Sequence, residues 1–202
     1  MLSMMMPRAA VHAKDFAGNY YLDNGLEMGS ELLLRPNGGF EFMLSYGAAD
    51  YWARGDWHFV DGAVMLNSEP APPKPPFRLA RTGHKPIEGV RIFVVAPNGR
   101  RVPNIDVILQ HSGGVAEIRT DADGVAWFED AQRPLAVLFS VWVYRFEAGP
   151  INLNREHNEF SFVINADQIT QLRFNDERLT VDEDMLVMRY WGDDHPLLYA
   201  RQ

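Results

Sequence analysis

Apolar side chains recur at every second position between residues 40 and 59, and this period of two restricts the fold more than any other feature of the sequence. Phe40, Phe42 and Leu44 alternate with Glu, Met and Ser, and the same alternation resumes after a Gly-Ala-Ala turn. Since successive side chains of a β-strand point to opposite faces, the pattern predicts strands that bury one face. We expect a meander of five short strands, near residues 17–22, 30–35, 40–46, 51–60 and 63–67.

A proline-rich segment divides the sequence, because residues 69–76 read Glu-Pro-Ala-Pro-Pro-Lys-Pro-Pro. Proline lacks the backbone N–H, so this segment suits neither a helix interior nor a central strand and predicts a semi-rigid linker. After it the strand pattern returns without a convincing amphipathic helix, which is typical of a β-sandwich. The predicted organisation is a leader at residues 1–14, a small β-meander domain at 15–68, the linker at 69–76 and a β-sandwich domain at 77–202.

Turn residues at regular intervals mark the strands that we expect after the linker. These strands lie near residues 90–95, 105–109, 116–119, 125–128, 135–144, 159–164, 171–174 and 185–191. One helical turn is expected at 165–172, where Asn165 or Asp167 can serve as the N-cap. The predicted fold class is therefore all-β.

A family resemblance supports the sandwich. Residues 89–128, "GVRIFVVAPNGRRVPNIDVILQHSGGVAEIRTDADGVAWF", place a strand, an Asn-Gly turn, a second strand and a Thr-Asp-Ala-Asp-Gly turn in succession. This order resembles the transthyretin-like or carboxypeptidase-regulatory-like sandwich, and the resemblance implies an accessory domain without catalytic residues. The hydroxyisourate-hydrolysing branch of that family ends in a Tyr-Arg-Gly-Ser-type motif. This chain ends Tyr-Ala-Arg-Gln instead, so the resemblance does not extend to that activity.

The part of the chain before the linker is loosely similar to lipocalin-like sheets, in its runs Gly-Asn-Tyr-Tyr-Leu and Gly-Asp-Trp-His-Phe. About 55 residues are too few for a full eight-stranded barrel of that kind. The overall expectation is a small antiparallel meander or partial barrel, followed by an immunoglobulin- or transthyretin-like β-sandwich.

Composition excludes several classes of chemistry. The sequence has no cysteine, which rules out disulfides, thiolate nucleophiles and cysteine-ligated zinc. The formal net charge of -8 argues against a nucleic-acid partner, because binding to a phosphate backbone depends on clustered Lys and Arg. Arg100-Arg101 is the only adjacent basic pair, and we interpret it as part of a solvated turn. No apolar stretch approaches the roughly 18 residues of a membrane-spanning helix, and no motif predicts a cofactor.

The first residues bear on localisation. Residues 1–6 form a short, mostly apolar run, and Val11-His12-Ala13 has the small-x-small ending of a signal-peptidase site. A positive charge is missing before the apolar run, so the segment fits either a remnant export signal or a simple leader. We expect a periplasmic or secreted protein, with the cytoplasm as the alternative.

The best local candidate for ligand binding is a stripe on the fourth expected strand. Trp52, Arg54, Asp56 and His58 share the face opposite to the apolar one. Trp52 could stack on a ligand while the other three supply polar contacts. The alternative is a solvated outer face on which Arg54 and Asp56 form an exposed ion pair.

A metal site is the second local candidate. Asp193, Asp194 and His195 supply two carboxylates and an imidazole beside a proline. The alternative is an acidic exposed loop that joins two terminal strands. The sequence has no Gly-x-Ser-x-Gly motif and no phosphate-binding glycine loop, so it predicts no catalytic residues.

Three functions remain open. The first is a non-catalytic, exported protein that binds another protein or a glycan. The second is a carrier that holds a small apolar ligand between the two β units, which requires an apolar cavity. The third is a hydrolase whose carboxylate and histidine site assembles in space. The missing catalytic motifs place the first ahead of the other two, and the sequence does not define an oligomeric state.

Overall fold

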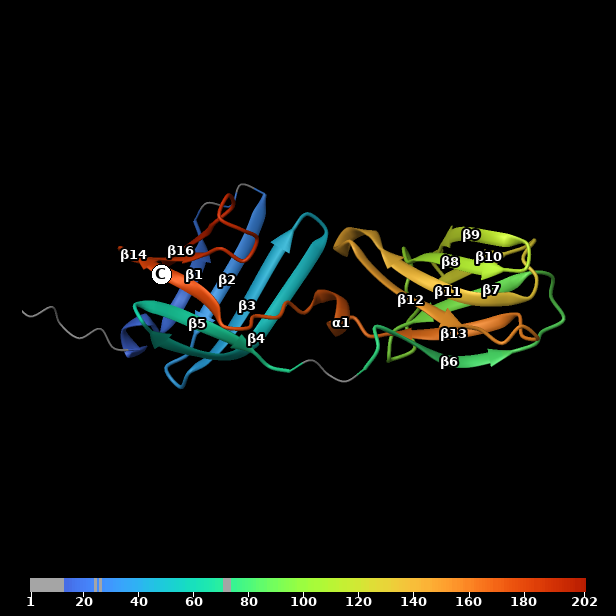
Figure 1. The fold of residues 1–202 in the computed structure, drawn as a ribbon, viewed down its shortest axis with the longest axis horizontal. Helices are drawn as coiled ribbons and strands as arrows, with labels where there is room; N and C mark the ends of the chain where they lie inside the picture. The colour runs from blue at the N-terminus through green and yellow to red at the C-terminus, as the bar shows by residue number, and fades with distance from the viewer. Residues whose placement is uncertain (1–12, 24, 26, 71–73) are drawn as a thin grey trace, which may run out of the picture. The chain divides into compact units, whose positions relative to one another are not determined.

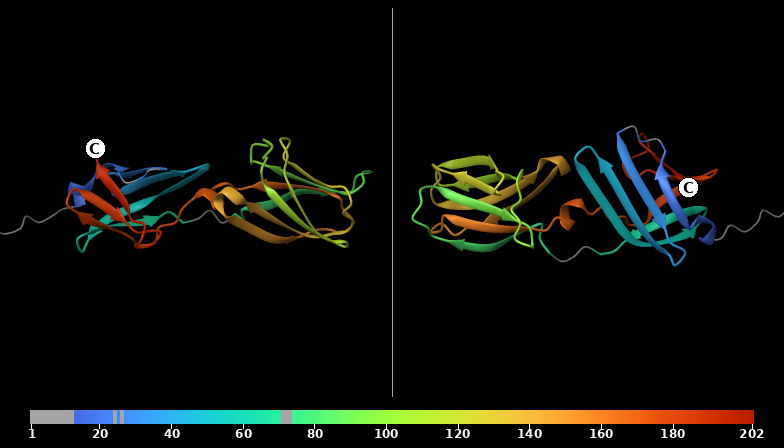
Figure 2. Two further views of the ribbon diagram at one scale, coloured as in Figure 1. Left: turned by 90° about the horizontal axis from the view of Figure 1, so that it is seen from above. Right: turned by 180° about the vertical axis from the view of Figure 1, so that it is seen from behind.

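The computed structural model describes residues 13–23, 25, 27–70 and 74–202. Most of the predicted leader, residues 1–12, and residues 71–73 of the predicted linker lie outside the described residues. The chain is all-β, as predicted, and forms two compact units. The barrel unit comprises Met1–Pro70 and Gln171–Gln202, and the sandwich unit comprises Ala71–Thr170. Figures 1 and 2 show that the blue first strands and the red last strands belong to the same unit.

The barrel unit is a closed, eight-stranded, antiparallel barrel in which β1 pairs with both β2 and β16. A short 3-10 turn, η1 (Ala13–Phe16), precedes the first strand. The strands are β1 (Gly18–Leu22), β2 (Met28–Leu34), β3 (Gly39–Tyr46), β4 (Ala49–Val60), β5 (Ala63–Ser68), β14 (Glu177–Asp182), β15 (Met185–Met188) and β16 (Leu197–Arg201). The first five match the predicted meander, because each pairs with its neighbour in sequence through a short turn.

The structure divides the chain differently from the prediction at two points. The expected partial barrel is complete, and residues 171–202, which we assigned to the sandwich, supply β14, β15 and β16 to the barrel. The sandwich unit is therefore an insertion between β5 and β14. The physical reason is that five strands leave two open edges, whose unpaired N–H and C=O groups need partners. Those partners come from the far end of the chain.

The sandwich unit consists of two four-stranded sheets. Sheet 1 has the order β10-β7-β13-β6 and sheet 2 the order β12-β11-β8-β9. Their strands are β6 (Phe77–Gly83), β7 (Val90–Val95), β8 (Asp106–His111), β9 (Gly114–Arg119), β10 (Val125–Phe128), β11 (Pro134–Val141), β12 (Phe146–Asn152) and β13 (Glu159–Ile164). The turn η2 (Trp142–Tyr144) follows β11, and α1 (Asp167–Thr170) is the helical turn predicted near Asp167. Residues 171–174 form only an isolated bridge, at Gln171.

The two ends of the sandwich unit are neighbours. Phe77 at the start of β6 pairs with Ile164 at the end of β13. The backbone N–H of Asn165 donates to the backbone carbonyl of Pro76. In the barrel unit, the two strands that flank the insertion are also neighbours, since Ser68 donates its backbone N–H to the carbonyl of Phe174 over 2.9 Å. The insertion thus occupies the position of a hairpin loop between β5 and β14.

Each unit has its own hydrophobic core. In the barrel unit Phe174 packs against Phe42 and Tyr190, with ring centroids 5.1 and 5.2 Å apart. In the sandwich unit Phe139 of sheet 2 stacks on Phe77 of sheet 1 at 4.2 Å, so the two sheets share one interior. Two separate cores predict two separate unfolding transitions.

We therefore expect Phe174→Ala and Phe139→Ala to lower the stability of different units. Each change removes a buried ring and leaves a cavity, which typically costs about 3–5 kcal/mol. In urea unfolding followed by near-ultraviolet circular dichroism, each variant should shift one transition to lower denaturant and leave the other in place. Tyr46→Ala, at an exposed ring, is the control and should shift neither. An equal shift of both transitions by either phenylalanine variant would contradict independent cores.

Candidate functional site

The predicted stripe on β4 lies on the outside of the barrel. Ala53 and Trp57 of the same strand point into the core, whereas Arg54, Asp56 and His58 are exposed and Trp52 is half-buried. Arg54 forms an ion pair with Glu69 over 2.8 Å instead of the expected pair with Asp56. Its guanidinium carbon also lies 5.7 Å from the centroid of the Trp52 ring. The four side chains share one face, as the alternation predicts.

The predicted metal ligands lie in the connection between β15 and β16. Asp193, Asp194 and His195 are exposed, and Asp193 pairs with Arg189 at 3.4 Å. Across residues 13–23, 25, 27–70 and 74–202, no three His, Asp or Glu side chains are grouped so that they could hold a metal ion. The described geometry thus gives the metal hypothesis no support.

The interior of the barrel is filled by its own side chains. The largest fully buried ones include Phe42, Leu32, Leu34, Leu66, Leu179, Leu186 and Tyr199. The hydroxyl of Tyr199 lies 2.7 Å from the Oγ of Ser30, and the hydroxyl of Tyr20 donates to the carbonyl of Phe16 over 2.8 Å, so both of these phenol groups are hydrogen-bonded. Burial raises the pKa of Tyr199, and it also raises those of Tyr20 and Tyr190. The side chains inside the barrel therefore form its hydrophobic core.

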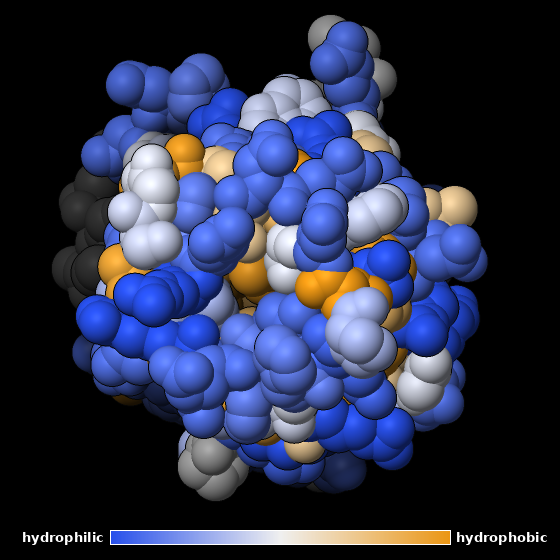
Figure 3. Space-filling view, turned by 90° about the vertical axis from the view of Figure 1, so that its right-hand side faces the viewer, coloured by the Kyte–Doolittle hydropathy of each residue, from blue (hydrophilic) through white to orange (hydrophobic). Residues whose placement is uncertain are grey.

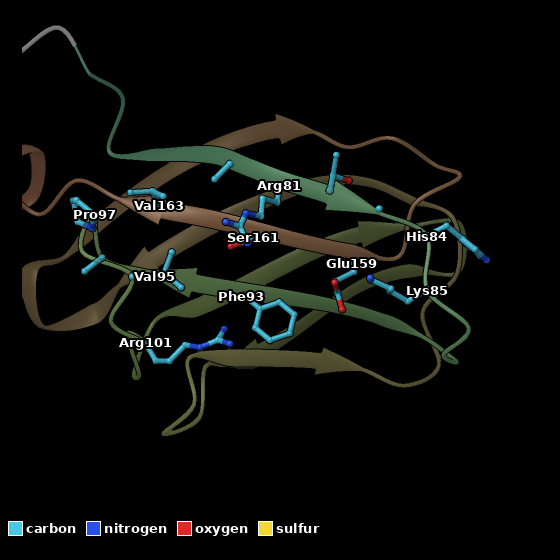
Figure 4. A pocket seen from close by; sticks show the side chains of 15 residues that line it. Arg81, His84, Lys85, Phe93, Val95, Pro97, Arg101, Glu159, Ser161 and Val163 are labelled. Carbon is cyan, nitrogen blue, oxygen red and sulfur yellow. The ribbon is translucent and has the colours of Figure 1, made fainter.

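The outer face of sheet 1 contains a groove of about 680 Å³. It arises because β7 and β13 alternate strictly: Ile92, Val94 and Phe162 face the core, while Phe93, Val95 and Ser161 face outward. We call it the basic groove. The lining includes Arg81, Lys85, Phe93, Arg101, Glu159 and Ser161, and Figure 4 shows these side chains on the same side of the sheet.

Two arginines on this face lie over aromatic rings. The guanidinium carbon of Arg101 is 4.8 Å from the centroid of Phe93, and that of Arg91 is 4.7 Å from the centroid of Trp127. Cation–π contacts of this length attract a guanidinium to the ring and restrict the positions that it takes. The sheet therefore presents two guanidinium groups, those of Arg91 and Arg101, as hydrogen-bond donors in restricted positions.

Among the residues that the structure describes, the cations of the basic groove have no carboxylate partners. Among the described residues the ion pairs join Arg35, Arg54, Arg119 and Arg189 to acids; neither Arg81 nor Arg101 takes part in one. The sandwich unit has eleven Lys and Arg against eleven Asp and Glu, so the formal charge of -8 belongs entirely to the barrel unit. A basic surface exists on an acidic protein because most of the acids lie elsewhere.

One hydroxyl–imidazole pair borders the groove. The Oγ1 of Thr82 lies 2.9 Å from the Nδ1 of His157, and this contact is exposed to solvent. In the part of the chain that the structure describes, no carboxylate is hydrogen-bonded to His157, so the pair lacks the third group that orients a catalytic base.

Figure 3 shows the end of the sandwich unit that contains the connection between β6 and β7. Its surface is mostly hydrophilic, and hydrophobic colour is confined to small separate patches. An apolar docking surface is therefore not the distinguishing feature at this end. The charge and geometry of the basic groove distinguish the unit more clearly.

The sequence interpretation missed the basic groove. It placed Arg101 in a solvated turn and contained no strand at Phe77–Gly83, so it gave Arg81 no position. The signal that could have found the groove is the run Val90–Val95, where the alternation puts Arg91, Phe93 and Val95 on one face.

No family model, no curated protein and no solved structure matches this chain. Among the described residues, no helix has the length and apolar character needed to cross a membrane. The assignment of function therefore depends on the chemistry of the surfaces described above.

The raised pKa values of the buried tyrosines predict that alkali destabilises the barrel unit. The folded barrel holds the phenolic protons more tightly than the unfolded chain does, so the stability they contribute is complete below about pH 10 and is lost as the pH rises further. We expect the urea midpoint of the barrel transition to stay level up to about pH 10 and to fall as the pH rises to about 11. Tyr199→Phe should make this fall smaller.

The same variant should lower stability at neutral pH by about 1 kcal/mol, because the hydrogen bond to Ser30 is lost. Tyr46→Phe removes a hydroxyl from an exposed ring and is the matched control. An alkaline slope that is identical in wild type and Tyr199→Phe would show that this burial does not govern the pH response.

Proposed function

We propose that the chain is a non-catalytic binding protein that takes up an anionic ligand in the basic groove of the sandwich unit. One observation carries the proposal: the guanidinium carbon of Arg101 lies 4.8 Å from the centroid of Phe93, within the groove, and Arg101 has no carboxylate partner among the described residues. A guanidinium fixed in this way loses little side-chain entropy when it binds a carboxylate, sulfate or phosphate. Arg81 and Lys85 line the same groove and add positive charge.

The architecture is compatible with this role. An all-β chain with a closed barrel is consistent with the resemblance to lipocalin-like barrels. The proposed resemblance of the sandwich unit to transthyretin-like domains implies an accessory domain without catalytic residues. Export to the periplasm or the medium remains part of the proposal. It rests on the apolar run and the small-x-small pattern within residues 1–13.

The proposal predicts that polyanions bind to the sandwich unit through Arg81 and Arg101. Isothermal titration of the full chain with poly-L-glutamate and with heparin oligosaccharides should detect binding that weakens as salt is added. The double variant Arg81→Gln, Arg101→Gln should weaken it by about tenfold or more, because each lost charge-assisted hydrogen bond contributes roughly 1.5–3 kcal/mol.

The matched control is Arg133→Gln with Arg155→Gln, which makes the same change of charge at two exposed arginines that do not line the groove. This control should bind almost as tightly as the wild type. Equal losses in the two double variants would mean that only net charge matters, and absence of binding to every polyanion would refute the proposed function.

A further inference from the structure

The floor of the basic groove contains an acid among the cations. Glu159 opens β13 and is paired in register with Arg91 of the parallel strand β7, so both lie on the outer face of sheet 1. The described residues include no ion pair between them. Figure 4 shows Glu159 and Lys85 toward the end of the groove away from Arg101. The groove therefore offers a carboxylate acceptor together with its cationic donors.

This acid discriminates between classes of polyanion. A sulfated glycan or a single strand of nucleic acid presents negative charge along its whole length, and its charge would face Glu159 as well as the arginines. A polypeptide carries its negative charge only on chosen side chains, and its backbone N–H groups can donate to Glu159 or to the hydroxyl of Ser161. A groove lined by both cations and a carboxylate favours a ligand that combines anionic groups with N–H donors.

The aromatic rings lead to the same conclusion. Binding of sugars or bases without sequence preference commonly uses open ring faces as stacking platforms. Here one face of Phe93 is covered by the guanidinium of Arg101, and one face of Trp127 by that of Arg91. These rings orient arginines and are not open stacking platforms. Recognition therefore depends on the guanidinium groups, which can bind a carboxylate through two parallel hydrogen bonds.

The spacing of the cations fits an extended chain. Arg81, Ser161 and Phe93 form a row across sheet 1, because Ser161 pairs with Arg81 on one side and with Phe93 on the other. Neighbouring strands are about 4.8 Å apart, so Arg81 and the Phe93–Arg101 pair are separated by roughly 10 Å of backbone. Two or three residues of an extended peptide span about 7–10 Å. Acidic residues at that interval can meet both arginines.

On this basis we propose that the ligand of the basic groove is an acidic, extended segment of a partner polypeptide, whose carboxylates bind Arg81 and Arg101 and whose backbone N–H groups meet Glu159. This inference deepens the proposed function and depends on it. A second copy of the chain is the alternative occupant, and the sedimentation measurement described below distinguishes it from a partner polypeptide.

Two of the four edge strands, β6 and β12, are less suitable for such a segment than the face is. The edge strand β6 has a register shift against β13 between Ser161 and Phe162, and bulged edges resist the addition of a strand. The edge strand β12 contains Pro150, which has no N–H to offer. A peptide therefore has more to gain on the outer face of sheet 1.

The test measures fluorescence anisotropy of a labelled peptide of alternating glutamate and serine, with the full chain as titrant. Its counterpart with glutamine in place of glutamate is the control ligand. Heparin oligosaccharide and oligothymidylate serve as competitors. The glutamate peptide should bind more tightly than the glutamine peptide, and Arg81→Gln with Arg101→Gln should weaken its binding by about tenfold or more.

Glu159→Gln supplies the decisive comparison, since it keeps shape and removes the acid. It should weaken binding of the glutamate peptide by about twofold to fivefold and strengthen binding of heparin and oligothymidylate by a similar factor. Glu156→Gln, at an exposed acid outside the groove, is the matched control and should change neither. Far-ultraviolet circular dichroism verifies that each variant is folded.

The outcomes separate the two proposals. If heparin binds through Arg81 and Arg101 but the glutamate peptide does not, the proposed function stands and this inference fails. If Glu159→Gln strengthens all three ligands alike, the acid only repels and the inference also fails. If sedimentation shows self-association that the double arginine variant abolishes, a second copy fills the groove and the inference is overturned. If no polyanion binds, both proposals fail.

Discussion

Closure of the barrel is the constraint on which the rest of the molecule depends. Five strands in sequence form a curved sheet with two unpaired edges, and the barrel becomes complete only when β14 pairs with β5 and β16 pairs with β1. The chain must therefore return to the barrel after the sandwich unit. The backbones of β4 and β5 approach closely at Gly55, a residue of β4 that pairs with both β3 and β5. Any side chain at this position would collide with the backbone of Asn67. Closure removes the edges, so the barrel has no open strand on which another chain could aggregate.

Interactions between neighbours in sequence were predictable, and interactions between distant segments were not. The meander from β1 to β5 follows from alternation and glycine turns, because each pairing is local. The strand at Glu177–Asp182 was missed, because it is acidic and only Leu179 among its residues is fully buried. The stripe on β4 was placed on the correct face, but its ion pair with Glu69 depends on where the chain continues after β5. The basic groove needed the register of three strands from two distant parts of the sequence, and periodicity contains no register between strands.

The two units separate charge as well as structure. In the sandwich unit acids and bases balance, yet Arg81, Arg91 and Arg101 gather on one sheet face, while Asp106 and Arg119 of sheet 2 neutralise each other in a bidentate ion pair with N–O distances of 2.6 and 3.0 Å. At physiological salt, electrostatic influence decays within about 8 Å. A local arrangement of this kind can therefore attract an anion although the whole chain is acidic. Net charge alone led the sequence interpretation to underestimate this surface.

The neighbouring ends of the sandwich unit have a consequence for the order in which the chain folds. Before the sandwich forms, β5 and β14 are joined by about 100 residues, and bringing them together costs the closure entropy of that long loop. Once Phe77 and Ile164 have paired, the effective loop shrinks to about 20 residues, which lowers this entropic cost by roughly 1.5 kcal/mol. Formation of the sandwich unit therefore lowers the entropic cost of pairing β5 with β14, two strands that are otherwise separated by about half of the polypeptide.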